Sequence, residues 1–136
     1  MEKLKIDNDI KVFYVTADSF PDGILPAHQK LHKMIPYSTD RKYFGISRPE
    51  NGSGIVYRAA AEEMTPGEAE KLNLESLVLK KGNYISETLR DYAKDISSIS
   101  RTFNELLSQP GLDPQGYCVE WYINNTDMKC MIRLEE

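Results

Sequence analysis

The sequence predicts a single α+β domain, built from an antiparallel sheet with helices on one side. Two observations predict this fold class: the expected elements run in the order strand, helix, strand, strand, and the same order returns in the second half of the chain. A third is the length, because a chain of 136 residues can bury a core of its own without covalent staples. We therefore expect one domain over residues 1–136.

The first half is expected over about residues 8–64. Residues 10–15 predict an interior strand, because apolar side chains occupy both of its faces. Pro26 stands where a helix can begin, and apolar residues at helical spacing follow it as far as Ile35, which predicts a short helix. A hairpin completes this half, with its first strand, loop and second strand at residues 43–48, 49–54 and 55–62.

The second half is expected over about residues 76–135. Residues 65–74, just before it, fit either a helical turn or a crossover between the halves. Residues 77–89 predict an extended element with a bend at residues 80–83. A helix with Asp95 as its N-cap is predicted next, because apolar residues then recur every three or four positions. A second hairpin ends the chain, with strands at residues 116–123 and 128–134.

The repeated order of elements predicts that the domain is a duplication. Residue identity between the halves is slight, so this prediction rests on the order and spacing of the elements. Two units with one helix each would place both helices on one side of the sheet. A ligand cleft would then lie at the seam between the units.

The composition excludes several classes of function. The chain has 17 basic and 21 acidic residues and a formal charge of −4, so it lacks the positive surface that a nucleic-acid backbone requires. No segment reaches the length of a membrane span, and we expect a cytoplasmic protein with no membrane contact. Two cysteines are too few for a disulfide framework or a Cys-based zinc site, and we expect no metal and no cofactor.

The segment at residues 116–123 carries a carboxylate among large apolar residues. Side chains alternate along a strand, so Cys118, Glu120 and Tyr122 share one face, while Trp121 belongs to the other, wholly apolar face. We expect the apolar face to pack under the helices. Glu120 would then lie on the face that points away from them.

Two interpretations of Glu120 remain open on the residues alone. The carboxylate is either solvated or satisfied by an arginine such as Arg58 or Arg133, or it lines a cavity and binds a ligand. A carboxylate inside a cavity must be matched by a cation or by hydrogen-bond donors. Aromatic rings beside it would favour a cationic, partly apolar ligand.

Three motifs of the chain resemble the GyrI-like small-molecule-binding domain, which also occurs as the effector-binding domain of AraC-type and MerR-type transcription regulators. The motifs are the KGNY segment at residues 81–84, Asp113 followed by proline, and the VEWY run at residues 119–122. The resemblance extends over nearly the whole chain through the order of elements. It implies two units related by a pseudo-twofold axis, and a cleft in which Glu120 and Tyr122 meet cationic or amphipathic ligands.

The other residues that we expect in the binding site are aromatic or lie close to Glu120. Tyr84 belongs to the KGNY motif, and Tyr57 and Tyr14 lie on predicted strands of the first half. Cys118 shares the face of Glu120, although a small buried residue is the simpler interpretation. His28 and His32 are four residues apart on the first helix, which suits a metal pair, but a solvated helix face is the expectation.

We therefore predict a standalone domain that senses or sequesters a cationic or amphipathic small molecule. It would pass its ligand state to a separate regulator protein, because the chain has no room for a DNA-binding helix-turn-helix. One alternative is a small-molecule hydrolase in which Glu120 is the catalytic residue. The other is a protein-binding module of the gyrase-inhibitor type.

Overall fold

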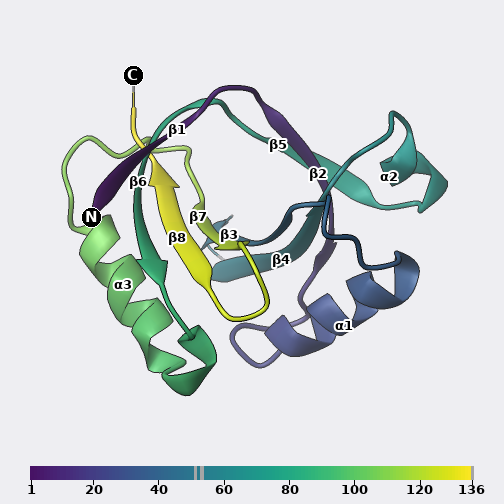
Figure 1. The fold of residues 1–136 in the computed structure, drawn as a ribbon, viewed down its shortest axis with the longest axis horizontal. Helices are drawn as coiled ribbons and strands as arrows, with labels where there is room; N and C mark the ends of the chain where they lie inside the picture. Colours follow the sequence, from purple (N-terminus) through teal and green to yellow (C-terminus); the bar gives the residue numbers. More distant parts are fainter. Residues whose placement is uncertain (51, 53, 136) are drawn as a thin grey trace.

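A computed structural model describes residues 1–50, 52 and 54–135 of the chain. Eight strands form one antiparallel sheet, which curls into a half-barrel with the helices outside the curl (Figure 1). This architecture confirms the predicted α+β class. The elements are β1 (Glu2–Ile6), β2 (Ile10–Thr16), α1 (Ile24–Met34), β3 (Tyr43–Pro49), β4 (Ile55–Glu62), α2 (Glu68–Lys71), β5 (Glu75–Leu79), β6 (Gly82–Leu89), a 3-10 turn (Tyr92–Lys94), α3 (Ser97–Leu107), β7 (Cys118–Tyr122) and β8 (Met128–Arg133).

The order of strands across the sheet is β1-β6-β8-β7-β3-β4-β2-β5. β3 and β7, from different halves of the chain, are paired at its centre. Each is followed outward by its own hairpin partner, β4 or β8, and then by the strand that precedes its helix, β2 or β6. The outermost strand on each side comes from the other half of the chain: β1, at the N-terminus, pairs with β6, and β5 pairs with β2.

The inner face of the curl holds one apolar core. Alternate residues of every strand point into it, as the period of two in a strand requires. Phe44, Ile46 and Val119 are buried there at the centre of the sheet, and Tyr84 and Met131 are buried nearer β6 and β8. Burial of these large apolar side chains stabilises the curled sheet from its inner face.

The outer face of the curl is covered by helices over two separate clusters. α1 buries Leu31 against Phe13 and the small residues of β4, and α2 adds Ala69 to the same cluster. α3 buries Leu106 against β8. Tyr122 is packed against both clusters, so it lies where the two helices come nearest to the middle of the sheet.

The expectation that Glu120 points away from the helices is wrong. Trp121 and Val119 pack into the inner core, where the Trp121 ring lies 6.2 Å from the ring of Phe44. Glu120 and Tyr122 are therefore on the outer face, which α1 and α3 cover. Alternation along the strand correctly separated the two faces, but in this sheet both faces are apolar, and the more apolar one fills the barrel.

Several element boundaries differ from the expectations. The N-terminal strand β1 was not expected, and the extended element at residues 77–89 is two strands, β5 and β6, because the chain turns at the predicted bend. Asp95 does not cap α3; its Oδ1 instead accepts a hydrogen bond of 2.7 Å from the Ser97 hydroxyl. The predicted loop at residues 49–54 includes residues 51 and 53, which lie outside the described residues. Among the described helices, none is long and apolar enough to cross a membrane.

Candidate functional site

A cleft of about 730 Å³ opens on the outer face between α1 and α3. Its floor is Glu120 and Tyr122 on β7, and its walls come from both helices and from the segments that lead into and out of them. Apolar side chains of both helical segments, among them Leu25 and Ile96, line the cleft and are largely exposed. This volume lies in the range of small-molecule sites, roughly 300–1,000 Å³.

Two tyrosine hydroxyls hold the Glu120 carboxylate. Tyr57 Oη donates to Glu120 Oε1 over 2.7 Å, and Tyr122 Oη donates to the same oxygen over 2.8 Å. Tyr57 comes from β4 and is only 2% exposed, so its hydroxyl cannot donate to solvent instead of Glu120. Tyr122 lies beside Glu120, as the alternation along the strand predicts. Tyr57, which was predicted to bind the ligand, contacts Glu120 but is not among the residues that line the cleft.

Gly45 makes the contact between Tyr57 and Glu120 possible. It lies on β3, directly across from Glu120 in the register of the β3–β7 pair. A Cβ atom at this position would collide with Tyr57 Oη and with Glu120 Oε1. Glycine within a strand is unfavourable for the strand itself, and here it leaves space for two neighbouring side chains to meet above it.

His28 extends the hydrogen-bond network to α1. Its Nε2 lies 2.7 Å from Tyr57 Oη and 3.3 Å from Tyr122 Oη. Each tyrosine hydroxyl has a single hydrogen, which goes to Glu120, so Tyr57 Oη must accept from His28 Nε2–H. The expectation of a solvated helix face is therefore wrong for His28. Burial, and then the neighbouring His32, lower the pKa of His28 to about 4, so the ring is neutral at physiological pH.

Burial disfavours the charged form of Glu120 at the floor of the cleft. Loss of water raises the pKa of its carboxyl, and the two tyrosine hydrogen bonds oppose this shift. Burial and the charge of Glu120 raise the pKa values of the Tyr57 and Tyr122 hydroxyls well above the usual 10. Both hydroxyls therefore remain protonated and act as donors.

No cationic side chain in the described part of the chain forms an ion pair with Glu120. Arg58 and Arg133, which sequence reasoning offered as partners, lie elsewhere: Arg58 pairs with Glu50, and Arg133 with Asp113 at 3.0 Å. Arg41 lines the cleft, but its guanidinium pairs with Glu68 at 2.9 Å. The Glu120 carboxylate thus accepts hydrogen bonds from two hydroxyls, and no cationic side chain among the described residues pairs with it.

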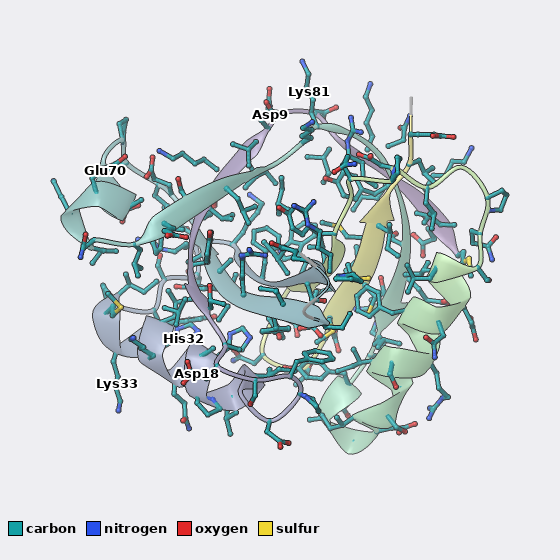
Figure 2. All side chains as sticks on the ribbon, turned by 180° about the vertical axis from the view of Figure 1, so that it is seen from behind. Asp9, Asp18, His32, Lys33, Glu70 and Lys81 are labelled. Carbon is teal, nitrogen blue, oxygen red and sulfur yellow. The ribbon has the colours of Figure 1, made fainter. Side chains whose placement is uncertain are left out.

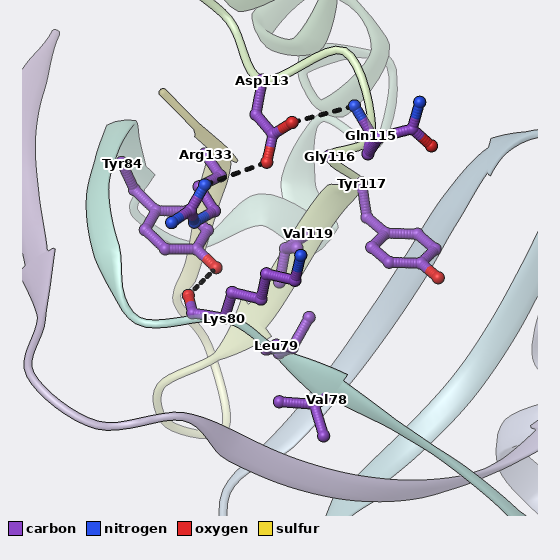
Figure 3. A pocket seen from close by; sticks show the side chains of 10 residues that line it. All are labelled: Val78, Leu79, Lys80, Tyr84, Asp113, Gln115, Gly116, Tyr117, Val119 and Arg133. Carbon is purple, nitrogen blue, oxygen red and sulfur yellow. Dashed lines mark hydrogen bonds and ion pairs between the residues drawn. The ribbon is translucent and has the colours of Figure 1, made fainter. Parts of the chain in front are cut away.

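Tyr84 and Tyr14 do not reach the cleft. Tyr84 is buried in the inner core and donates to the carbonyl oxygen of Lys80 over 2.7 Å. Figure 3 shows its ring beside Arg133 in a separate cavity of only about 50 Å³, at the end of the barrel. Tyr14 packs against the inner core and donates to Glu75 Oε2 over 2.9 Å. Both were expected to bind the ligand, and both point to the opposite face of the sheet.

Cys118 lies on the same face as Glu120, two residues earlier on β7. It packs in the cluster beneath α3, and burial followed by the charge of Glu120 raises its pKa to about 11. A thiol that remains protonated at neutral pH is a poor nucleophile. Cys118 is a half-buried packing residue and does not line the cleft.

A row of rings continues from the floor along the α1 side of the cleft. The His28 and His32 rings are 6.5 Å apart, the His32 ring is 5.1 Å from Tyr43, and Tyr43 stacks on Tyr37 at 5.5 Å. In Figure 2, Lys33 projects away from α1, whereas the adjacent His32 lies on the side nearer the sheet. Within the described residues, no group of three or more potential metal ligands is assembled.

Sequence reasoning passed over His28 and Gly45 as site residues. A glycine inside a predicted strand was a usable signal, because such a position often marks a close approach of neighbouring groups. The spacing of His28 and His32 was noticed, but nothing local indicated that α1 would lie above Tyr57. That contact depends on how the helix packs across β4, 29 residues further along the chain.

The fold and the cleft define a class of small α+β domain, with a curled antiparallel sheet and a ligand-sized cleft between two outer helices. The crystal structure of the integron cassette protein VCH_CASS2, from the mobile metagenome of Vibrio cholerae, shares this fold with a TM-score of 0.71 and 14% identity over 98% of this chain and 95% of that one. The crystal structure of a hydrolase from Listeria innocua is similar with a TM-score of 0.59 and 10% identity over 98% and 90% of the two chains. No protein-family model and no curated protein matches the sequence.

Proposed function

We propose that the protein binds a small amphipathic cation in the cleft between α1 and α3, with Glu120 as its charged partner. The observation that carries this proposal is the carboxylate itself, held at the cleft floor by Tyr57 and Tyr122. A carboxylate that is partly withdrawn from water and meets no described cation is costly to the free protein. A cationic ligand would remove that cost, which gives the site a preference for positive charge.

The remaining walls suit the apolar part of such a ligand. The row of rings from His28 to Tyr37 offers aromatic faces, and cations and alkylammonium groups are attracted to ring faces. Leu25 and Ile96 are 65% and 60% exposed beside the opening, where they can cover an apolar body that extends beyond the cleft. A charged floor and an apolar rim together favour an amphipathic molecule.

The resemblance to the GyrI-like domain is consistent with this proposal, and we extend the proposal to it. The symmetric order of strands about β3 and β7 supports an origin by duplication, with the cleft at the seam of the two units. In that case the protein is an effector-binding domain in the cytoplasm. It would sequester its ligand or report it to a separate regulator protein.

Binding of a simple probe tests the proposal. Isothermal titration with 2-naphthylmethyl-trimethylammonium should give saturable binding to the wild-type protein and at least about tenfold weaker binding to Glu120→Gln. Glu105→Gln is the matched control, because it removes the same charge from an exposed position of α3. Equal affinity of wild type and Glu120→Gln, or equal loss in both variants, would contradict the proposal.

A hydrolase is the second candidate, and one observation favours it. The hydrogen bonds from His28 through Tyr57 to Glu120 form a continuous chain that could move a proton at the cleft floor. The same cleft would then bind an electrophilic substrate with a cationic group, such as an acetate ester of a trimethylammonium alcohol. Turnover by the wild type and none by Glu120→Gln would favour this function, and tight binding without turnover would exclude it for that substrate.

A further inference from the structure

The two oxygens of the Glu120 carboxylate differ in their hydrogen bonds. Oε1 accepts hydrogen bonds from Tyr57 at 2.7 Å and from Tyr122 at 2.8 Å. A carboxylate oxygen offers two lone-pair sites, so these two hydroxyls occupy both acceptor sites of Oε1. A ligand that enters the cleft finds no free acceptor on this oxygen.

Oε2 is the oxygen that is open to a ligand. It receives no hydrogen bond from any described residue. It is also absent from the buried polar atoms that lack a partner, and Glu120 lines the cleft, so Oε2 is accessible from the cleft. The two tyrosines thus hold the Glu120 carboxylate in a fixed orientation, in which Oε1 has no remaining acceptor site and Oε2 can still accept hydrogen bonds.

This arrangement restricts the shape of cation that the carboxylate can accept. A guanidinium or amidinium binds a carboxylate through two parallel N–H···O bonds, which require a free lone pair on each oxygen. A tertiary ammonium needs one acceptor and a quaternary ammonium needs none. Both direct their N-alkyl groups toward neighbouring rings, and here the rings of His28 and Tyr122 lie edge-to-face at 5.3 Å beside the carboxylate.

The Nε2 atom of His28 does not replace the missing acceptor, because both tyrosine hydrogens go to Glu120 and Nε2 therefore carries the hydrogen that Tyr57 Oη accepts. The Tyr57 oxygen in turn is already a donor to Glu120 and an acceptor from His28. A forked donor such as a guanidinium would therefore leave one N–H group without an acceptor on the carboxylate, which is costly once the ligand has displaced water from the floor.

We propose that the cleft selects tertiary and quaternary ammonium ligands and rejects guanidinium and amidinium ligands, because Tyr57 and Tyr122 occupy one oxygen of Glu120. This inference rests on the proposed binding function and names the class of cation that the site takes. Tyr57 and Tyr122 then act as specificity residues as well as supports for the carboxylate. Removing either hydroxyl opens an acceptor on Oε1.

Three probes with one apolar body test this inference by isothermal titration: N,N-dimethyl-2-naphthylmethylamine in its protonated form, 2-naphthylmethyl-trimethylammonium and 2-naphthylmethyl-guanidinium. The wild-type protein should bind the first two at least about tenfold more tightly than the third. In Tyr57→Phe the ratio of guanidinium to trimethylammonium affinity should rise by about tenfold, since a bidentate pair becomes available. Tyr122→Phe should shift the ratio in the same direction, and it serves if Tyr57→Phe does not fold.

Tyr84→Phe is the control, because it removes a buried tyrosine hydroxyl on the opposite face of the sheet and should leave the ratio unchanged. Wild-type protein that binds the guanidinium as tightly as the ammonium probes would overturn the inference while leaving the binding function intact. An unchanged ratio in both Tyr57→Phe and Tyr122→Phe would do the same. Failure of all three probes to bind would instead overturn the binding function and the selectivity together.

Discussion

Gly45 and Glu120 lie directly across from each other on β3 and β7, and the absence of a side chain on Gly45 is what allows Tyr57 to reach the carboxylate. The pair stands at the centre of the sheet, where strands from the two halves of the chain meet. The candidate site therefore depends on a contact between residues that are 75 positions apart in the sequence.

Gly45→Ala should destabilise the protein and weaken binding of the trimethylammonium probe. The new Cβ would collide with Tyr57 Oη and Glu120 Oε1, and overpacking of this kind costs about 1–3 kcal/mol in the free energy of unfolding. Urea denaturation and titration measure the two effects. Ser47→Ala, two residues further on the same face of β3, should change neither by much. Wild-type stability and affinity in Gly45→Ala would show that the site tolerates the extra atom.

Glu120→Gln should be at least as stable as the wild type at pH 8. Burial raises the pKa of Glu120, so the folded state holds the carboxyl proton more tightly than the unfolded state does. Ionisation of Glu120 therefore destabilises the folded state, and this loss of stability develops as the pH rises above the ordinary carboxyl pKa. The amide avoids this cost and can still accept from both tyrosines, so we expect a higher free energy of unfolding for the variant.

Thermal melts between pH 4 and pH 8 check this expectation. The advantage of Glu120→Gln should shrink toward pH 4, where the wild-type carboxyl takes up its proton. Glu105→Gln, at the surface, should follow the wild type throughout. A variant that is less stable than the wild type at pH 8 would indicate that an unrecognised cation compensates the carboxylate.

His28 should make the protein sensitive to acid. The folded state keeps its pKa near 4, whereas an unfolded histidine titrates near 6.5. Below about pH 6.5 the unfolded state therefore takes the proton first, and stability falls until about pH 4, by about 3 kcal/mol if His28 acts alone. Urea unfolding at several pH values measures this slope.

His28→Gln should flatten the pH dependence of stability, because its amide can donate to Tyr57 but does not titrate in this range. His32→Gln is the comparison and should flatten the profile less: burial lowers the pKa of His32 as well, but His32 has no hydrogen bond to the network and is only the second cause of the lowered His28 pKa. Parallel pH profiles of wild type and His28→Gln would contradict the assignment of the acid sensitivity to His28.

Tyr84→Phe should lose stability without losing ligand affinity. Its hydroxyl donates to the Lys80 carbonyl in a buried position, so removing it leaves that carbonyl oxygen without this bond and costs about 1 kcal/mol. The ring lies in the inner core, on the opposite face of the sheet from the cleft. Titration with the trimethylammonium probe checks the affinity, and a tenfold loss would mean that the two faces are coupled.

The sequence by itself determined the class of the fold and the relative placement of one pair of residues in the candidate site. Period-two alternation on β7 places Glu120 and Tyr122 on one face whatever the rest of the chain does, and turn residues delimit most of the strands. The same local patterns predicted α1 and the two hairpins, because capping, turn and periodicity signals act over a few residues.

Only the tertiary structure decided which face of β7 meets the helices and which side chains converge there. Both faces are apolar enough to be buried, so their assignment depends on how the whole sheet curls. The approach of His28 and Tyr57 to Glu120 joins three elements that are distant in sequence, and the space above Gly45 exists only once β3 pairs with β7. For the same reason Tyr84 and Tyr14, which looked equivalent to Tyr57 in the sequence, point to the other face: a single step in strand register exchanges the two sides.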